Sequence, residues 1–139
     1  MTENMEKNEG DCYSSLEEFF LDCARYGDKE DLLDCIKDGA QLDCVDQNNN
    51  NAVHMCSANG HTEILRILCE SLKNADKLKI INDLNSSGNT PLHWSTLTNK
   101  VDSVKILLEY DADVNLMNLK EEKAFDVAYN FCHSELVEI

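Results

Sequence analysis

The sequence predicts an all-α solenoid of about four helix–turn–helix repeats, in which β-turn tips project between the repeats. Three observations support this prediction: residue types recur at a fixed spacing, apolar residues follow the period of a helix, and residues that start or stop helices separate the segments. Repeats with a period of roughly 20–50 residues indicate stacked units that bury a core only together.

The fixed spacing is 33 residues, lengthened once to 39. His93, in the segment GNTPLHWS, has Asp126 33 residues after it and His54 39 residues before it. Leu21 lies a further 33 residues before His54. This register predicts a repeat domain over 14–139 that follows a disordered or extended segment over 1–13. The repeats are expected at about 14–45, 46–84, 85–117 and 118–139, the last being a truncated cap.

The first helix of each repeat is predicted from the residues that begin it. Pro91 fits the first helical position, because its φ is already helical and its missing N–H would have no partner there. Thr90 then fits the N-cap, where its hydroxyl accepts a hydrogen bond from a backbone N–H of the first turn. We therefore expect a helix over 91–98 and at the equivalent positions of the other repeats.

The second helix of each repeat is predicted from apolar periodicity. The segments EILRIL and DSVKILL place apolar residues at helical spacing with polar residues between them. A helix is therefore expected over 103–109, and Gly39 is expected to follow the second helix of the first repeat as its C′ residue. The six extra residues of the second repeat fall within 69–85. They predict either a longer second helix or a short extra helical turn.

These features resemble the ankyrin repeat. The resemblance rests on the 33-residue period, on the string Thr90-Pro91-Leu92-His93, on Gly60-His61 and on DADVN at 111–115. It covers about residues 14–139, and it implies a solenoid that binds other proteins. The fourth repeat departs from the family pattern by replacing its Thr, Pro and His with Lys123, Ala124 and Asp126.

The resemblance also implies which residues are buried. Cys23 and Cys56 occupy a position where the family has alanine, and Cys35 one where it has leucine, so we expect buried, reduced thiols rather than metal or redox sites. His54 and His93 are expected to form internal hydrogen bonds. Leu92 and its equivalents are expected to face the neighbouring repeat; these are Phe20, Val53 and Phe125.

A closer resemblance covers about residues 46–105, including the inserted segment NADKLKIINDLN. This stretch is similar to a small, acidic fungal ankyrin-repeat chaperone of a small-subunit ribosomal protein. The resemblance implies an escort for a newly made ribosomal protein, located in the cytoplasm, the nucleus or both.

The chain is strongly acidic, with a formal net charge of −15 from 27 acidic and 12 basic residues. Residues 1–46 carry −10 of this charge and residues 47–139 carry −5. Such a surface repels phosphate backbones and anionic lipids, so we expect no nucleic-acid or membrane partner, and it attracts basic proteins. The alternative is that the acidity only maintains solubility.

Cysteine usage and the first residues indicate a reducing compartment. Residues 1–11 have neither the basic nor the apolar stretch of a secretory signal. The chain has seven cysteines, an odd number, and no two of them are at CxxC spacing. Reduced thiols in the cytoplasm or nucleus are therefore expected.

Ankyrin stacks bind partners mainly through their turn tips and the exposed side of each first helix, so the register predicts a binding face. Trp94, Tyr26 and Phe131 are the expected aromatic anchors, although Trp94 could instead pack between repeats. The densest acidic patch comprises Glu17, Glu18, Asp22, Asp28, Glu30, Asp31 and Asp34. The predicted protein-binding residues are Asp22, Arg25, Tyr26, Gln47, Asn48, Asn50, Met55, Asn59, Asn89, Trp94, Leu97, Thr98 and Phe131.

The sequence thus predicts a protein-binding module without cofactor, metal site or catalytic activity, monomeric when free. The first hypothesis is an acidic escort, chaperone or adaptor for a basic client such as a ribosomal protein. The second is a regulatory inhibitor or scaffold that docks on a folded enzyme or signalling partner. The third hypothesis, a cysteine-based enzyme, has the least support, because no cysteine, histidine and acid stand at a catalytic spacing.

Overall fold

The computed structural model describes residues 15–72, 74–131 and 133–138, so the N-terminal segment predicted over 1–13 lies outside the described residues. Within the described residues the chain forms nine helices and no strand. The helices are α1 (Leu16–Tyr26), α2 (Lys29–Lys37), α3 (Ala52–Ala58), α4 (Thr62–Ser71), α5 (Asn74–Ile81), α6 (Pro91–Leu97), α7 (Val101–Glu109), α8 (Ala124–Asn130) and α9 (Ser134–Val137). None of these helices is both long enough and apolar enough to cross a membrane.

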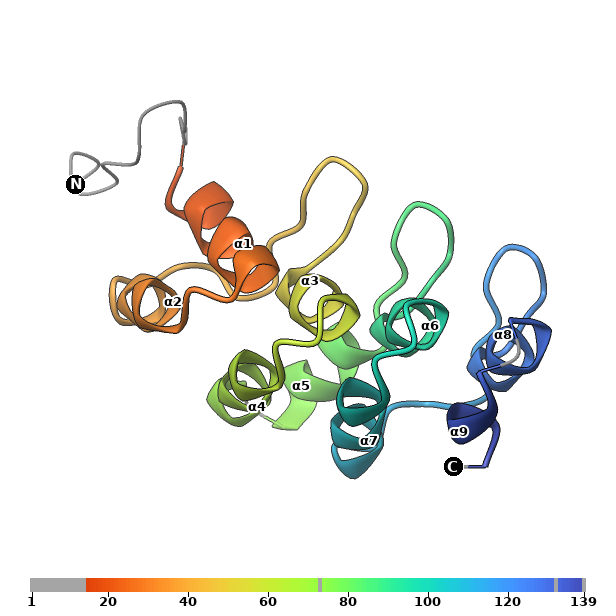
Figure 1. Cartoon of the computed structure of the whole chain (residues 1–139). Coiled ribbons are helices and arrows are strands. Elements are labelled where there is room, and N and C mark those ends of the chain that lie inside the picture. Colours follow the sequence, from red (N-terminus) through yellow and green to blue (C-terminus); the bar gives the residue numbers. More distant parts are fainter. Residues whose placement is uncertain (1–14, 73, 132, 139) are drawn as a thin grey trace.

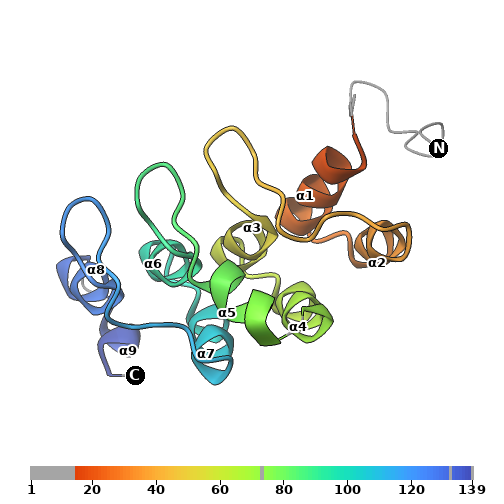
Figure 2. The same ribbon diagram turned by 180° about the vertical axis from the view of Figure 1, so that it is seen from behind.

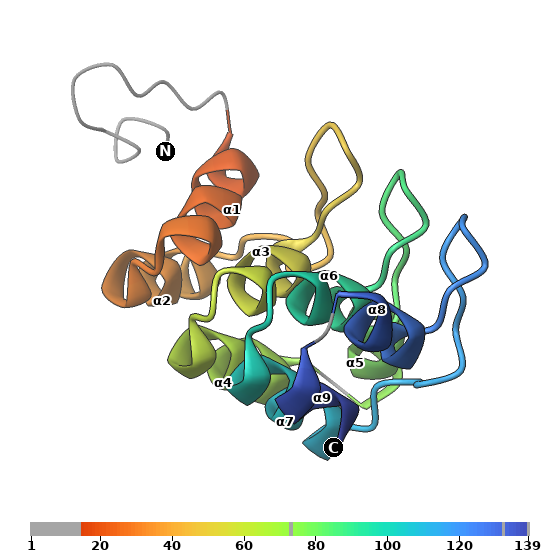
Figure 3. The same cartoon turned by 45° about the vertical axis from the view of Figure 1, so that its right-hand side comes forward.

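The helices lie in two rows, which confirms the predicted all-α solenoid. Figure 1 shows α1, α3, α6 and α8 in an inner row, with α2, α4, α7 and α9 in an outer row. Each inner helix packs against the next one in the row. Three long loops project beside the inner row and run side by side (Figure 3). Stacking in one direction leaves an extended inner face made of the inner helices and these loops.

The predicted signals begin the inner helices. Pro91 is the first residue of α6, and the Thr90 hydroxyl accepts a hydrogen bond from the His93 N–H at 3.2 Å. In α3 the Asn51 side chain takes the same role, accepting from the His54 N–H at 2.9 Å. The helices expected over 91–98 and 103–109 are confirmed, although α6 ends one residue earlier and α7 starts two residues earlier.

The three loops share one turn, which we call a tip (46–50, 85–89 and 118–122). Its first residue accepts two backbone N–H bonds through its side chain; Asn85 Oδ1, for example, accepts from Ser87 and Asn89, each at 3.0 Å. The fourth residue has a left-handed backbone in all three tips: Asn49 (φ 62°), Gly88 (φ 75°) and Glu121 (φ 61°). Glycine adopts this conformation freely, whereas Glu121 incurs a cost of about 1 kcal/mol.

The insertion forms a separate helix, as the second alternative expected, but this helix is longer than the single turn that was predicted. Helix α4 ends at Ser71, and α5 follows as an eight-residue helix. Figure 2 shows α5 between the inner and outer rows, on the side hidden in Figure 1. Its last two residues, Ile80 and Ile81, are 3% and 0% exposed. The Asn51 side chain donates a hydrogen bond to the Ile80 carbonyl at 3.0 Å, which ties α5 to the start of α3.

The core lies between successive repeats, and one expectation about it is wrong. Phe20, Val53 and Leu92 are 0%, 1% and 3% exposed, as expected of residues that face a neighbouring repeat. Phe125, at the same position of α8, is 56% exposed. The reason is that no helix pair in the described part of the chain packs beyond α8 and α9. The prediction that Cys23, Cys35 and Cys56 are buried is confirmed, at 1%, 2% and 0% exposure.

Candidate protein-binding face

A cleft of about 580 Å³ opens on the inner face at the N-terminal end of the stack. It lies between α1, the first tip and the start of α3. The described residues that line it are Ser15, Glu17, Glu18, Leu21, Asp22, Arg25, Val45, Asp46, Gln47 and Met55. Four of these side chains are acidic and one is basic, so the cleft has a negative potential.

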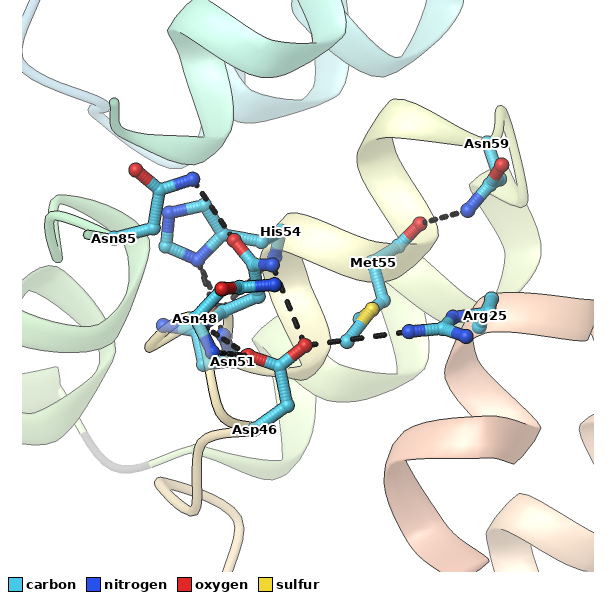
Figure 4. Close-up of polar contacts among 9 residues, drawn as sticks. Arg25, Asp46, Asn48, Asn51, His54, Met55, Asn59 and Asn85 are labelled. Atoms are coloured by element: carbon cyan, nitrogen blue, oxygen red, sulfur yellow. Dashed lines mark hydrogen bonds and ion pairs between the residues drawn. The ribbon is translucent and has the colours of Figure 1, made fainter. Parts of the chain in front are cut away.

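Two of the four carboxylates of the cleft accept hydrogen bonds from backbone donors. Glu17 Oε2 accepts a hydrogen bond from the Gln41 N–H at 2.9 Å. Asp46 Oδ1 accepts from the backbone N–H groups of Asn48 at 2.8 Å and Asn50 at 2.9 Å. The second Asp46 oxygen lies 4.0 Å from Arg25 Nη2, a long and partly exposed ion pair (Figure 4). These contacts fix the positions of the two carboxylates without neutralising the cleft.

The floor of the cleft is apolar. Leu21 and Met55 are 5% and 3% exposed, and Val45 is 42% exposed. Met55 lines the same cleft as Asp46 and Arg25, and Figure 4 shows the three side chains together. An apolar floor with acidic walls matches a long basic side chain, since Lys and Arg bury an aliphatic stem and keep a charged head at the surface.

The structure corrects the predicted binding residues at two positions. Met55 forms the floor of the cleft rather than an exposed contact, because α1 packs across α3. Asn50 is 5% exposed, because its side-chain oxygen accepts a hydrogen bond from Asn85 Nδ2 of the next tip at 2.8 Å. Asn50 therefore links two tips and is not available as a contact residue.

The other predicted binding residues lie at the surface. Asp22, Asn89 and Trp94 are half-buried. Two of the exposed residues also have structural roles, since Thr98 Oγ1 donates to the Ala58 carbonyl at 2.9 Å and Asn59 Nδ2 donates to the Met55 carbonyl at 2.8 Å. The exposed residues are Arg25, Tyr26, Gln47, Asn48, Asn59, Leu97, Thr98 and Phe131.

Six residues that line the cleft are absent from the predicted binding residues: Ser15, Glu17, Glu18, Leu21, Val45 and Asp46. A usable signal existed for Asp46, because it stands at the same repeat position as Asn85 and Asn118. Aspartate and asparagine at that point of a turn bind their own backbone two residues on. Glu17 and Glu18 were recognised as acidic but were not assigned to the binding face. Glu30, Asp31 and Asp34 of the same acidic patch lie exposed on α2, in the outer row.

Aromatic and aliphatic side chains occupy the other end of the inner face. Trp94 packs edge-on against His54, with ring centroids 6.1 Å apart, so it contacts the previous repeat while remaining half-exposed. Phe131 is 56% exposed and stacks on His133, also at 6.1 Å. Leu97 is 39% exposed. This end of the face therefore offers apolar contact area instead of charge.

The two buried histidines form internal hydrogen bonds, as expected. Nδ1 of His54 accepts from the Asn51 N–H at 3.1 Å, and its Nε2 bonds the Asn89 carbonyl at 2.9 Å. Nδ1 of His93 accepts from the Thr90 N–H at 3.3 Å, and its Nε2 bonds the Glu122 carbonyl at 2.7 Å. Both patterns require a neutral ring with the proton on Nε2, and burial lowers the pKa of both histidines. Among the described residues, no group of three or more His, Cys, Asp or Glu side chains could hold a metal ion.

A family model for ankyrin repeats in three copies matches residues 20–118, more than half of the chain. The chain belongs to the ankyrin-repeat family. Repeat proteins of this kind present extended concave surfaces on which other proteins bind, so membership of the family indicates that the chain is a protein-binding module.

One solved structure and two curated relatives place the chain within this family. The chain is 30% identical to the chaperone Yar1 in the crystal structure of yeast Rps3 in complex with that chaperone; the match has a TM-score of 0.81 and covers 91% of each chain. It is 29% identical over 87 residues to human transient receptor potential cation channel subfamily A member 1, and 29% identical over 91 residues to chicken nuclear factor NF-kappa-B p105 subunit. These matches cover 63% and 66% of this chain but only 7% and 9% of the two relatives.

Proposed function

We propose that this chain is a non-catalytic escort that binds a Lys- or Arg-rich segment of another protein in the cleft beside α1. The observation that carries the proposal is the lining of the cleft, in which four acidic side chains surround an apolar floor with a single arginine among the described residues. The volume of about 580 Å³ lies in the range that encloses a drug-sized group, so it accommodates more than one basic side chain.

Binding would combine long-range attraction with short-range packing. A net charge of −15 steers a basic segment toward the stack over a Debye length of about 8 Å at physiological salt. Each exposed ion pair then contributes only about 0–1 kcal/mol, so several must act together. Burial of the aliphatic stems against Met55 and Leu21 adds an apolar term that salt does not screen. We expect an affinity that is micromolar or better and strongly dependent on salt.

The similarity to Yar1 supports a ribosomal protein as the client. That protein is the chaperone of ribosomal protein Rps3, and it matches this chain over nearly the whole of both chains. Under this proposal the escort works in the cytoplasm, the nucleus or both, is a monomer when free, and masks basic surface until the client is assembled.

The proposal is tested by measuring association with purified yeast Rps3 at low and high salt. The cleft variant combines Glu17→Gln, Glu18→Gln and Asp22→Asn. We expect it to slow association and to flatten the salt dependence, because it removes three carboxylates beside the bound segment.

The matched control removes three carboxylates from the outer row, by Glu30→Gln, Asp31→Asn and Asp34→Asn. It changes the net charge equally and should have a much smaller effect. If the two variants change association and its salt dependence equally, the client responds to the overall negative charge of the chain and not to a site in the cleft. If neither variant changes association or its salt dependence, the regulatory inhibitor or scaffold replaces the escort. Thermal melts of both variants confirm that the stack remains folded.

A further inference from the structure

The net charge on the inner face lies at one end of the inner row. Three positions of each inner helix point to this face in the predicted register, given on α1 by Asp22, Arg25 and Tyr26. The equivalent residues of α3, α6 and α8 include no charged side chain. The third tip region does contain charges, but its two lysines and two glutamates, Lys120, Lys123, Glu121 and Glu122, cancel. Net charge available to a partner therefore lies beside α1.

Apolar contact area lies at the opposite end of the same row. Leu97 of α6 is 39% exposed and Phe131, which follows α8, is 56% exposed. Trp94 lies half-exposed beside Leu97 on α6. Exposed aromatic side chains at a binding face are the residues that most often dominate affinity.

The middle of the inner row lies between the charged end and the apolar end and shares the properties of neither. On α3 the equivalent positions hold Met55 and Ala58, which are 3% and 6% exposed, and Asn59, whose side chain donates to the Met55 carbonyl. Thr98, which follows α6, is exposed but donates a hydrogen bond to the Ala58 carbonyl of α3. This region offers neither charge nor an exposed large apolar side chain, so basic and apolar contacts are segregated along the stack.

We infer that the segment bound by this chain is bipartite and lies across the inner face in one orientation, with its basic end at α1 and its apolar end at α6 and α8. The inference rests on the proposed function and specifies its partner. The reverse orientation would place basic groups over Leu97 and Phe131, where they would lose water without gaining a carboxylate. It would also place apolar groups against the carboxylates of the cleft.

The stack also sets the length of the segment. Packed helices lie about 8–10 Å apart, so the three steps from α1 to α8 span roughly 24–30 Å. A helical segment covers this distance in about 16–20 residues and an extended segment in about eight or nine. A shorter segment would reach only one of the two regions.

The test uses designed peptides of about 20 residues, a length that spans the face even as a helix. Two segregated peptides carry four lysines at one end and a Leu-Trp-Leu cluster at the other. The lysines are at the N-terminus of one peptide and at the C-terminus of the other. A third peptide has the same composition but alternates basic and apolar residues. We expect one of the segregated peptides to bind about tenfold more tightly than the alternating one, a difference of 1.4 kcal/mol.

Photo-cross-linkers at the two ends of the tighter peptide then report its orientation. The basic end should attach within 15–26 or 45–47, and the apolar end within 94–98 or 124–131. Phe131→Ala should weaken binding of this peptide several-fold but not that of a peptide shortened to its basic end. Phe125→Ala is the matched control, because Phe125 has the same exposure of 56% but lies off the inner-face row.

The outcomes separate the inference from the proposed function. If no basic peptide binds, both are wrong. If all the basic peptides bind equally well, or if each cross-linker attaches at both ends of the stack, the orientation is wrong while basic-segment binding stands. Selective attachment at opposite ends, with an effect of Phe131→Ala and none of Phe125→Ala, supports the orientation.

Discussion

The interior helices α3 and α6 and the last inner helix α8 begin with the same cap geometry but different chemistry. In α3 and α6 a histidine ring accepts the N-cap N–H and also bonds the carbonyl of the next tip. In α8 Asp126 Oδ2 accepts the Lys123 N–H at 3.0 Å. A carboxylate reproduces the cap but has no N–H to donate onward. Among the described repeats, the histidine thus stands where its ring also bonds the following tip, and the aspartate forms the cap alone.

Burial shows the same contrast. Leu92 on α6 and Phe125 on α8 occupy one repeat position, yet their exposures are 3% and 56%. The difference arises from the neighbouring repeat and not from the helix itself, because α8 packs on α6, whereas α8 contacts the preceding helix α6 and α9 of its own repeat and has no described repeat after it. Stability in a stack of this kind is carried largely by the interfaces between repeats.

The largest loss of stability should come from shortening the apolar side chain at this position of an interior repeat. Leu92→Ala should lower the free energy of unfolding by about 3 kcal/mol, because it removes buried area and leaves a cavity between α6 and α8. Phe125→Ala should change it by less than about 0.5 kcal/mol, since the ring is already in solvent. Urea unfolding of both variants measures the comparison. A Phe125→Ala cost equal to that of Leu92→Ala would show that α8 is covered in solution.

The histidines should make the interior repeats sensitive to pH. Burial lowers the pKa of His54 and His93 in the folded chain below the ordinary value of 6.5. Between the lowered pKa and 6.5 the unfolded chain therefore binds more protons. Their contribution to stability is full above 6.5 and is lost as the pH falls toward the lowered pKa.

The measurement is the free energy of unfolding across this pH window. Each histidine can contribute a slope of at most about 1.4 kcal/mol per pH unit. His93→Gln should lower stability at neutral pH and remove its share of the slope. An unaltered slope in His93→Gln would mean that other groups cause the pH dependence.

Features encoded locally were predictable from the sequence. Thr90 and Pro91 mark the start of α6 by themselves, and the 33-residue register carries this start to other repeats where the residues differ, as with Asn51 in α3. The insertion was predictable as helical, but its break from α4 at Ser71 was not, because the apolar spacing fits one long helix equally well.

Features set by contacts between repeats were less predictable. The register placed Met55 on the binding face, yet α1 packs across α3 and leaves Met55 as the floor of a cleft. Asn50 was expected at an exposed tip, but a hydrogen bond from Asn85 of the next tip draws it inward. In both cases a neighbouring repeat decides the exposure, and periodicity within one repeat carries no information about it.

The smallest change in stability is expected at the position where all four repeats hold a small buried residue. Positions 23, 56, 95 and 128 hold Cys, Cys, Ser and Ala, and their exposures lie between 0% and 2%. Because the site accepts three small residues in the same packing, Cys56→Ala should cost about 1 kcal/mol or less. Cys56→Ser should be similar, since a hydroxyl there can donate to the Val53 carbonyl as Ser95 Oγ donates to the Leu92 carbonyl at 3.2 Å.

Cys56→Leu is the contrasting variant, because extra methylenes in a packed site force the neighbouring helices apart at a cost of about 1–3 kcal/mol. Urea unfolding ranks the three variants, and thiol labelling of the parent chain gives an independent check. Burial raises the pKa of the Cys56 thiol well above its ordinary value, so a thiol reagent should modify Cys56 only as fast as the chain opens. Fast labelling under native conditions, or a cost above about 2 kcal/mol for Cys56→Ala, would contradict the equivalence of these four positions.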